Sequence, residues 1–194
     1  MSNVHFTESA DGGAGLAPVV DALCGLTAVK EFDVSPAKGA APFTGPLPAD
    51  AIAACFPALH KLKANFGALS GPLPAALTTA SYIKLNDNAF DGAIPASWAG
   101  NRALFWVDVS NNRLTGGIPP AYANHPSLGV FRVAGNGLAG NVLGLAGAPL
   151  QVVSVAGNGG LCGPVPASVR WAKGYDATGT RLGAPCNGTA GAAA

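Results

Sequence analysis

Apolar residues recur in the middle of the chain in a fixed pattern: two apolar positions separated by one residue, then an asparagine, then another apolar position. In the copy LFWVDVSNNRLTGGIP, Val107 and Val109 are the separated pair, and Asn112 and Leu114 follow. Alternate side chains of a strand point to the same side, so Val107 and Val109 would share one face. The pattern therefore predicts a short strand with one buried face in each copy.

Copies of this pattern follow one another along the chain. Five of them begin at residues 59, 80, 104, 128 and 150, at spacings of 21, 24, 24 and 22 residues. A degenerate first copy runs over residues 29–48. A repeat of about 20–29 residues with one strand per copy is typical of a solenoid. One strand cannot bury its apolar face alone, so we expect the copies to stack into a parallel sheet over one continuous core.

An asparagine follows the predicted strand in four copies. Its amide can bond backbone groups of its own turn and of the neighbouring turn, which would otherwise be buried without partners. We expect these side chains to form a ladder along the solenoid: Asn88, Asn112, Asn136 and Asn158. In the copy that begins at residue 59, Gly67 stands in their place.

A short motif with a glycine and an apolar residue near its end closes each copy. Along the chain it reads TGPLP, SGPLP, DGAIP, TGGIP, AGNVL and CGPVP. LSGPLP at 69–74 and LTGGIP at 114–119 resemble the plant-specific leucine-rich repeat of receptor-like kinase ectodomains and polygalacturonase-inhibiting proteins. GNGGLCGPVP at 157–166 resembles the segment that ends the array in those ectodomains.

This resemblance covers residues 26–166 and implies a fold and a class of function. The expected fold is an α/β repeat solenoid, a short right-handed superhelix of about six leucine-rich repeats with a parallel sheet on its concave side. We expect an N-terminal cap at 1–28, the repeats at 29–166, and a C-terminal cap with a mobile tail at 167–194. Because the end coils expose core edges, we expect covering helices at 16–23 and 167–173, with Trp171 in the second cap's core.

Four cysteines lie near the two ends of the chain, with none between. Cys24 and Cys55 are near the first end, and Cys162 and Cys186 are near the second. An even count is consistent with two disulfides, for which three pairings are open, and four buried thiols are the alternative. We favour disulfides because each end is where a solenoid needs a cap.

Composition and charge narrow the class of protein further. Charged residues make up 11% and hydrophobic residues 49% of the chain, which favours a folded core over disorder. The net charge of +1 provides no attraction to nucleic acid or an anionic membrane. The uncharged stretch 137–157 contains a proline and follows the repeat register, so we expect no membrane insertion.

The chain shows no pattern that indicates catalysis or a cofactor. Cys55 precedes His60 by five residues, but a lone Cys and His do not make a nucleophile and base. Asp87 and Asp91 flank a turn without the closing glutamate of a calcium loop. We therefore predict a protein that is not an enzyme and has no cofactor or metal site.

A ligand would meet the outward side chains of the strands, because the concave sheet is the usual binding surface of such solenoids. Tyr82 and Trp106 fall side by side on neighbouring strands, and exposed aromatics are enriched at binding hot spots. The predicted ligand-binding residues are Lys63, Phe66, Tyr82, Lys84, Trp106, Asp108 and Arg132. The alternative is that the aromatics only pack together and the charges only pair across strands, at about 0.2–1 kcal/mol each.

These features lead to three functional hypotheses. The first is a non-catalytic module that recognises a protein or glycan on the concave face. The second is a permanent subunit of a larger extracellular or organellar assembly, and the third is an inhibitor of a cell-wall-degrading enzyme. The N-terminus lacks the apolar stretch of a signal peptide, so we expect a secreted or cell-surface chain with that peptide removed, or an organelle-lumen protein. Asn187 begins a glycosylation sequon.

Overall fold

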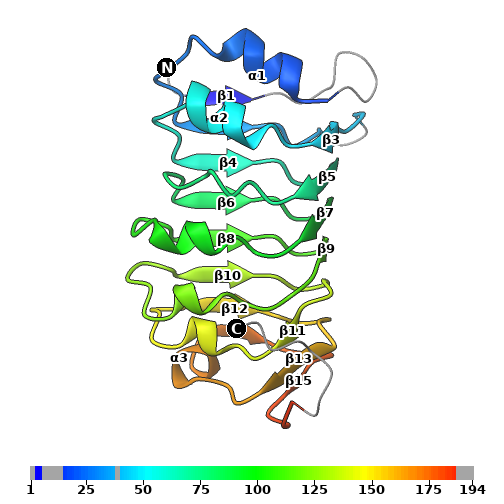
Figure 1. Cartoon of the computed structure of the whole chain (residues 1–194), viewed down its shortest axis with the longest axis vertical. Helices are drawn as coiled ribbons and strands as arrows, with labels where there is room; N and C mark the ends of the chain where they lie inside the picture. Colours follow the sequence, from blue (N-terminus) through cyan, green and yellow to red (C-terminus); the bar gives the residue numbers. More distant parts are fainter. Residues whose placement is uncertain (1–2, 6–14, 38–39, 187–194) are drawn as a thin grey trace.

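Each copy of the repeat supplies one strand of a long parallel sheet in the computed structural model, which describes residues 3–5, 15–37 and 40–186. Within those residues the sheet, here called sheet A, has eight strands in the order β1-β2-β4-β6-β8-β10-β12-β14. The six predicted strands are β2 (Glu31–Asp33), β4 (Lys61–Lys63), β6 (Tyr82–Lys84), β8 (Trp106–Asp108), β10 (Val130–Arg132) and β12 (Val152–Ser154). Figure 1 shows the coils stacked along one axis, which confirms the predicted solenoid.

Sheet A extends beyond the predicted repeats at both ends. β1 (Asn3–His5) pairs in parallel with β2, and β14 (Gly174–Asp176) pairs in parallel with β12. Neither strand carries the full repeat pattern, so the sequence did not predict them. Both complete the end coils of the solenoid by stacking one further rung on the adjacent strand.

The central inward side chains of the six predicted strands form the core. They are fully buried, and the set comprises Phe32, Leu62, Ile83, Val107, Phe131 and Val153. Residues two positions further on, such as Val109 and Val133, are buried beside them, as the period of two predicts. One continuous apolar cluster therefore runs the length of the stack.

The glycine-containing motif that closes each copy forms short strands, which pair into two narrow sheets separate from sheet A. One contains β3 (Thr44–Pro46), β5 (Ala68–Pro72), β7 (Ala89–Gly92) and β9 (Arg113–Leu114); the other contains β11 (Ala139–Gly140), β13 (Gly160–Gly163) and β15 (Arg181–Leu182). The motif glycine has positive φ in successive copies, as in Gly71 (80°) and Gly116 (76°). Only glycine adopts this backbone readily, which explains why the motif contains it.

Short helices follow that motif in the repeat coils, except in the coil that contains β5. They are α2 (Ala49–Cys55), η1 (Ala96–Gly100), η2 (Pro120–Tyr122), η3 (Leu143–Leu145) and α3 (Ala167–Arg170). Two of these helices, η1 and η2, supply a buried aromatic residue that is hydrogen-bonded to the preceding coil. Trp98 Nε1 donates to the Pro74 carbonyl at 2.8 Å, and the Tyr122 hydroxyl donates to the Pro95 carbonyl at 2.8 Å.

The four predicted asparagines join neighbouring coils through their side-chain amides. Asn158 is fully buried; its Oδ1 accepts from Leu138 N at 3.0 Å, and its Nδ2 donates to Val133 O at 3.0 Å and Val155 O at 2.9 Å. Asn88, Asn112 and Asn136 make the same set of contacts one coil apart. The buried turns thereby find partners for their backbone groups.

The two ends are capped differently. Helix α1 (Ala17–Leu23) covers the first coil with Val20 buried, close to the predicted span. At the other end α3 stops at Arg170, and the prediction for Trp171 is wrong, because its side chain is 79% exposed. Val169 and Ala172 are the buried residues there. The chain leaves the helix at Trp171 to begin β14 three residues later, which turns the indole outward.

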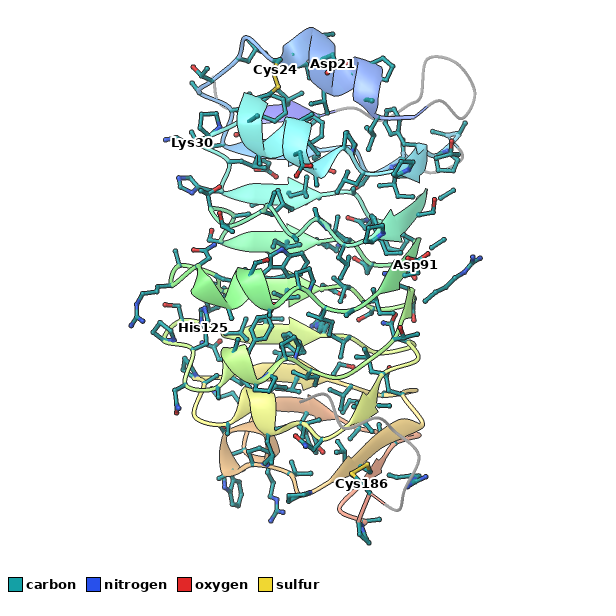
Figure 2. All side chains as sticks on the ribbon, viewed as in Figure 1. Asp21, Cys24, Lys30, Asp91, His125 and Cys186 are labelled. Carbon is teal, nitrogen blue, oxygen red and sulfur yellow. A yellow bond between two sulfur atoms is a disulfide. The ribbon has the colours of Figure 1, made fainter. Side chains whose placement is uncertain are left out.

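The predicted disulfides are confirmed, and their pairing is resolved. Cys24 is bonded to Cys55, which joins α1 to α2, and Cys162 is bonded to Cys186, which joins β13 to the segment after β15. Figure 2 shows both sulfur bridges near opposite ends of the stack. Asn187 and the predicted mobile tail lie outside the described residues.

Candidate functional site

The outward side chains of sheet A form one continuous surface, here called the open face. The parallel register places Lys61, Tyr82 and Trp106 in one row across β4, β6 and β8. A second row, two residues further along each strand, contains Lys63, Lys84, Asp108 and Arg132. Six of the seven predicted ligand-binding residues therefore share this face. The seventh, Phe66, follows the end of β4.

Two aromatic side chains of the first row form a stack with a cation at each end, one from the same row and one from the second row. The Tyr82 and Trp106 rings are stacked, with centroids 5.1 Å apart and planes inclined by 22°. Lys61 Nζ lies 5.4 Å from the Tyr82 centroid, and Arg132 Cζ lies 5.3 Å from the Trp106 centroid. Each cation sits over a ring face, where the quadrupole attracts it. We call these four residues the cation–aromatic stack.

Burial in this stack changes the pKa of the Tyr82 hydroxyl. Removal of water from around the phenol raises the pKa of Tyr82 above its ordinary value, with opposing effects from the nearby Lys63 and Arg132 charges. The hydroxyl therefore stays protonated at neutral pH and can donate a hydrogen bond to a ligand.

Acidic residues of β2 neutralise the lysines at one end of the face. Lys63 Nζ lies 2.7 Å from a Glu31 oxygen and 3.4 Å from an Asp33 oxygen, and Lys61 Nζ lies 3.3 Å from Glu31. The hydrogen bond from Lys63 lowers the pKa of Glu31 against the effect of burial, and the same bond raises the pKa of Lys63. Glu31 was not predicted, although it occupies the same row as Lys61.

Asp108 is the most buried of the predicted site residues, with 5% exposure. Its Oδ1 accepts a hydrogen bond from Ser110 N at 3.2 Å, and its Oδ2 lies 3.8 Å from Arg132 Nη1. The cross-strand pairing considered from the sequence is therefore present between Asp108 and Arg132. This carboxylate braces Arg132 over the Trp106 ring.

Phe66 and Lys84 form a separate contact at the edge of the open face. Phe66 is 60% exposed, and Lys84 Nζ lies 5.9 Å from its ring centroid. Lys84 thus leans toward β4 and away from Asp108, its register partner on β8. In the described part of the chain, two buried side-chain atoms without a hydrogen-bond partner also belong to the coils of this face, Asn86 Oδ1 and Trp106 Nε1.

The second half of the open face, from β10 onward, has smaller side chains. Val130 is only 3% exposed there, between Trp106 and Val152 on the adjacent strands. Three further apolar residues of this half, Ala134, Val152 and Ala156, are half-buried. Most of the distinctive chemistry therefore lies between β2 and β10.

Cys55 and the buried His125 have structural partners, whereas His60 is exposed. Cys55 is in a disulfide. His125 is buried; its Nε2 lies 3.0 Å from the Asn101 carbonyl, and its Nδ1 accepts from Leu128 N at 3.1 Å. Across the described residues, no group of three histidine, cysteine or acidic side chains is placed to hold a metal ion. Nor does any helix in those residues have the length and apolar character to cross a bilayer.

Solved structures of a plant ice-binding protein and of Arabidopsis receptor proteins share this fold. A plant ice-binding protein matches with a TM-score of 0.72 and 23% identity over 92% of this chain and 56% of its own. The Arabidopsis receptor kinase HAESA, in complex with the peptide hormone IDA and the co-receptor SERK1, matches with a TM-score of 0.74 and 23% identity over 94% of this chain and 30% of its own. The Arabidopsis thaliana BIR2 ectodomain matches with a TM-score of 0.58 and 29% identity over 67% of each chain.

These matches confirm the leucine-rich-repeat fold and the resemblance to plant proteins that the repeat motif indicated. The chain spans about half of the ice-binding protein and less than a third of the HAESA chain. No protein-family model and no curated protein sequence matches it.

Proposed function

We propose that this chain is a non-catalytic protein-binding module that holds its ligand on the open face of sheet A. The observation that carries the proposal is the cation–aromatic stack of Lys61, Tyr82, Trp106 and Arg132. Tyrosine, tryptophan and arginine are the side chains most enriched at binding hot spots. Here they stand on paired strands, so they are held in place before a ligand arrives, and less conformational entropy is lost on binding.

Two further observations support a protein ligand and an extracellular or cell-surface location. The HAESA structure contains a peptide hormone, and its fold covers 94% of this chain. The two disulfides favour an oxidising compartment. Binding to a glycan and inhibition of a cell-wall-degrading enzyme would use the same aromatic surface, and the binding test separates a glycan ligand from a protein ligand.

Ice binding, the property of one similar plant protein, is not favoured by the open face. A regular row of one small side chain, such as threonine, would be needed to match a lattice. The second row instead contains Asp33, Lys63, Lys84, Asp108 and Arg132 along five successive strands. A row of charged side chains that differ in sign and length offers no such regular repeat.

The test compares substitutions inside and outside the stack. Peptides selected from a random twelve-residue display library on the wild-type protein are the probe, beside an array of plant cell-wall oligosaccharides. Trp106→Ala and Tyr82→Ala should each weaken peptide binding roughly 30-fold or more, the scale of a hot-spot residue. Trp171→Ala is the matched control, because that indole is 79% exposed and lies at the C-terminal end of the solenoid, outside the cation–aromatic stack.

The controls separate the alternatives. Thermal melting should show that all three variants remain folded. Binding that is equally sensitive to Trp171→Ala and Trp106→Ala would remove the open face as the site. Oligosaccharide binding that depends on Trp106 would replace the protein ligand by a glycan. Size-exclusion chromatography should give a monomer, whereas aggregation of the isolated chain would favour a subunit of a larger assembly.

A further inference from the structure

One backbone position adopts a left-handed conformation in the turns that follow β6, β8, β10 and β12. It lies directly before the asparagine of the ladder, and its φ is 57° at Asp87, 54° at Asn111, 64° at Gly135 and 70° at Gly157. Aspartate, asparagine and glycine are the residues that tolerate this conformation, because others bring Cβ too close to the following carbonyl oxygen. The repeat thus selects small or self-bonding residues here.

Phe66 is the exception to this selection. It occupies the same position after β4 with φ of 58°, although phenylalanine is bulky and cannot bond its own backbone. Its side chain is 60% exposed, so the core does not require it. Strained residues of this kind concentrate at functional sites, where another requirement outweighs the local cost. An exposed aromatic in a strained conformation therefore points to a contact outside the chain.

Lys84, whose ammonium lies over the Phe66 ring, is also exceptional. Lys61 and Lys63 are paired with Glu31, and Arg132 is paired with Asp108. Among the described residues, Lys84 makes no ion pair, although it stands in the same row as Lys63 and Arg132. The open face therefore has one unmatched positive charge, and it lies between two aromatic surfaces.

We propose that Lys84 and Phe66 form the specificity-determining subsite of the open face, which selects a peptide with an acidic side chain flanked by large apolar side chains. The acidic group would pair with Lys84, one flanking side chain would lie on Phe66, and the other on the Tyr82–Trp106 rings. This inference rests on the proposed function and gives its ligand a definite chemistry.

The spacing of the three anchors matches an extended chain. Tyr82 and Lys84 are two residues apart on β6, which is about 6.6 Å along a strand. The Phe66 centroid lies 5.9 Å from Lys84 Nζ. In an extended peptide, alternate side chains on one side are also about 6.6 Å apart. The ligand motif is therefore apolar, any, acidic, any, apolar, with the three named side chains facing sheet A.

A charge-exchange experiment tests this subsite. Peptides selected from the twelve-residue library on the wild-type protein should be enriched in this motif. Lys84→Glu should weaken the best peptide at least tenfold, and changing the acidic residue of the peptide to lysine should restore affinity for the Lys84→Glu protein. Lys30→Glu is the matched control: it makes the same change in net charge at an exposed lysine beyond the edge of the open face (Figure 2).

Phe66→Asn supplies an independent measurement. Asparagine fits the left-handed backbone, as Asn111 does in the equivalent position. The variant should therefore fold and melt no more than a few degrees away from wild type, but bind the selected peptide several-fold more weakly. A variant that loses affinity only in proportion to a loss of folded protein would contradict the subsite.

The outcomes separate this inference from the proposed function. Peptides that lack acidic residues, ignore Lys84→Glu and still require Trp106 would overturn the subsite and leave the proposed function standing. Equal losses in Lys84→Glu and Lys30→Glu would also overturn it, because they indicate only long-range attraction. Peptides that require neither Lys84 nor Trp106, or a library that yields no binder, would overturn both.

Discussion

The asparagine ladder provides the sharpest test of how the solenoid is held together. Replacing Asn158 by alanine removes a fully buried amide that joins two neighbouring coils, its own turn at Val155 and the preceding coil at Val133 and Leu138. Val133 O retains a second donor, the Nδ2 of Asn136, at 3.0 Å. Leu138 N and Val155 O lose the side-chain partner that they have in the wild-type protein.

The expected magnitude follows from these two groups. Each buried backbone group left without a partner costs about 1–3 kcal/mol, so the loss of partners at these two groups should lower the unfolding free energy by roughly 2–6 kcal/mol. A domain of this size typically shifts its melting temperature by about 2–4 °C per kcal/mol. Because total stabilities are about 5–15 kcal/mol, this single amide accounts for a large fraction.

Urea denaturation followed by circular dichroism under non-reducing conditions measures the effect. Asn141→Ala is the matched control, because Asn141 is exposed and its Oδ1 accepts one hydrogen bond, from Leu143 N at 3.0 Å. We expect it to lose no more than about 1 kcal/mol. If Asn158→Ala and Asn141→Ala unfold at the same urea concentration, the ladder does not carry the stability assigned to it.

Two more predictions concern the N-terminal end. Replacing Cys24 and Cys55 together by serine should cost about 3–4 kcal/mol by chain entropy for a separation of 31 residues, measured as a lower urea midpoint; unchanged stability would show that α1 docks without the bond. Because the folded-state pKa of Glu31 lies below its unfolded value of about 4.5, its contribution to stability is complete above that pH and is lost as pH falls through the lower pKa. Lys63→Met should make the melting temperature depend less on pH over the acid range of roughly pH 2 to 6. A pH profile identical to that of the wild-type protein would refute the role of the pair.

The candidate site was only partly predictable. Register alone placed Tyr82 beside Trp106, because equivalent positions of stacked repeats are neighbours. The distribution of charge partners was not predictable, since long side chains choose among several neighbours. Lys63 pairs with Glu31 and Asp33 of β2, whereas Lys84 turns toward Phe66. The strain at Phe66 was likewise hidden, because the left-handed position is recognised only when several coils are compared in space.

The sequence by itself determined the period of the coils, the buried face of each predicted strand and the asparagines that join the turns. Each of these depends on a residue's immediate neighbours and on the identical coil beside it, so a repeated pattern is enough to specify them. Tertiary structure decided what happens where the repetition stops: the added strands β1 and β14, the exposure of Trp171 and the pairing of charges on the open face. At those places the contacts are made by residues without an equivalent in the next coil, and only their positions in space select one partner over another.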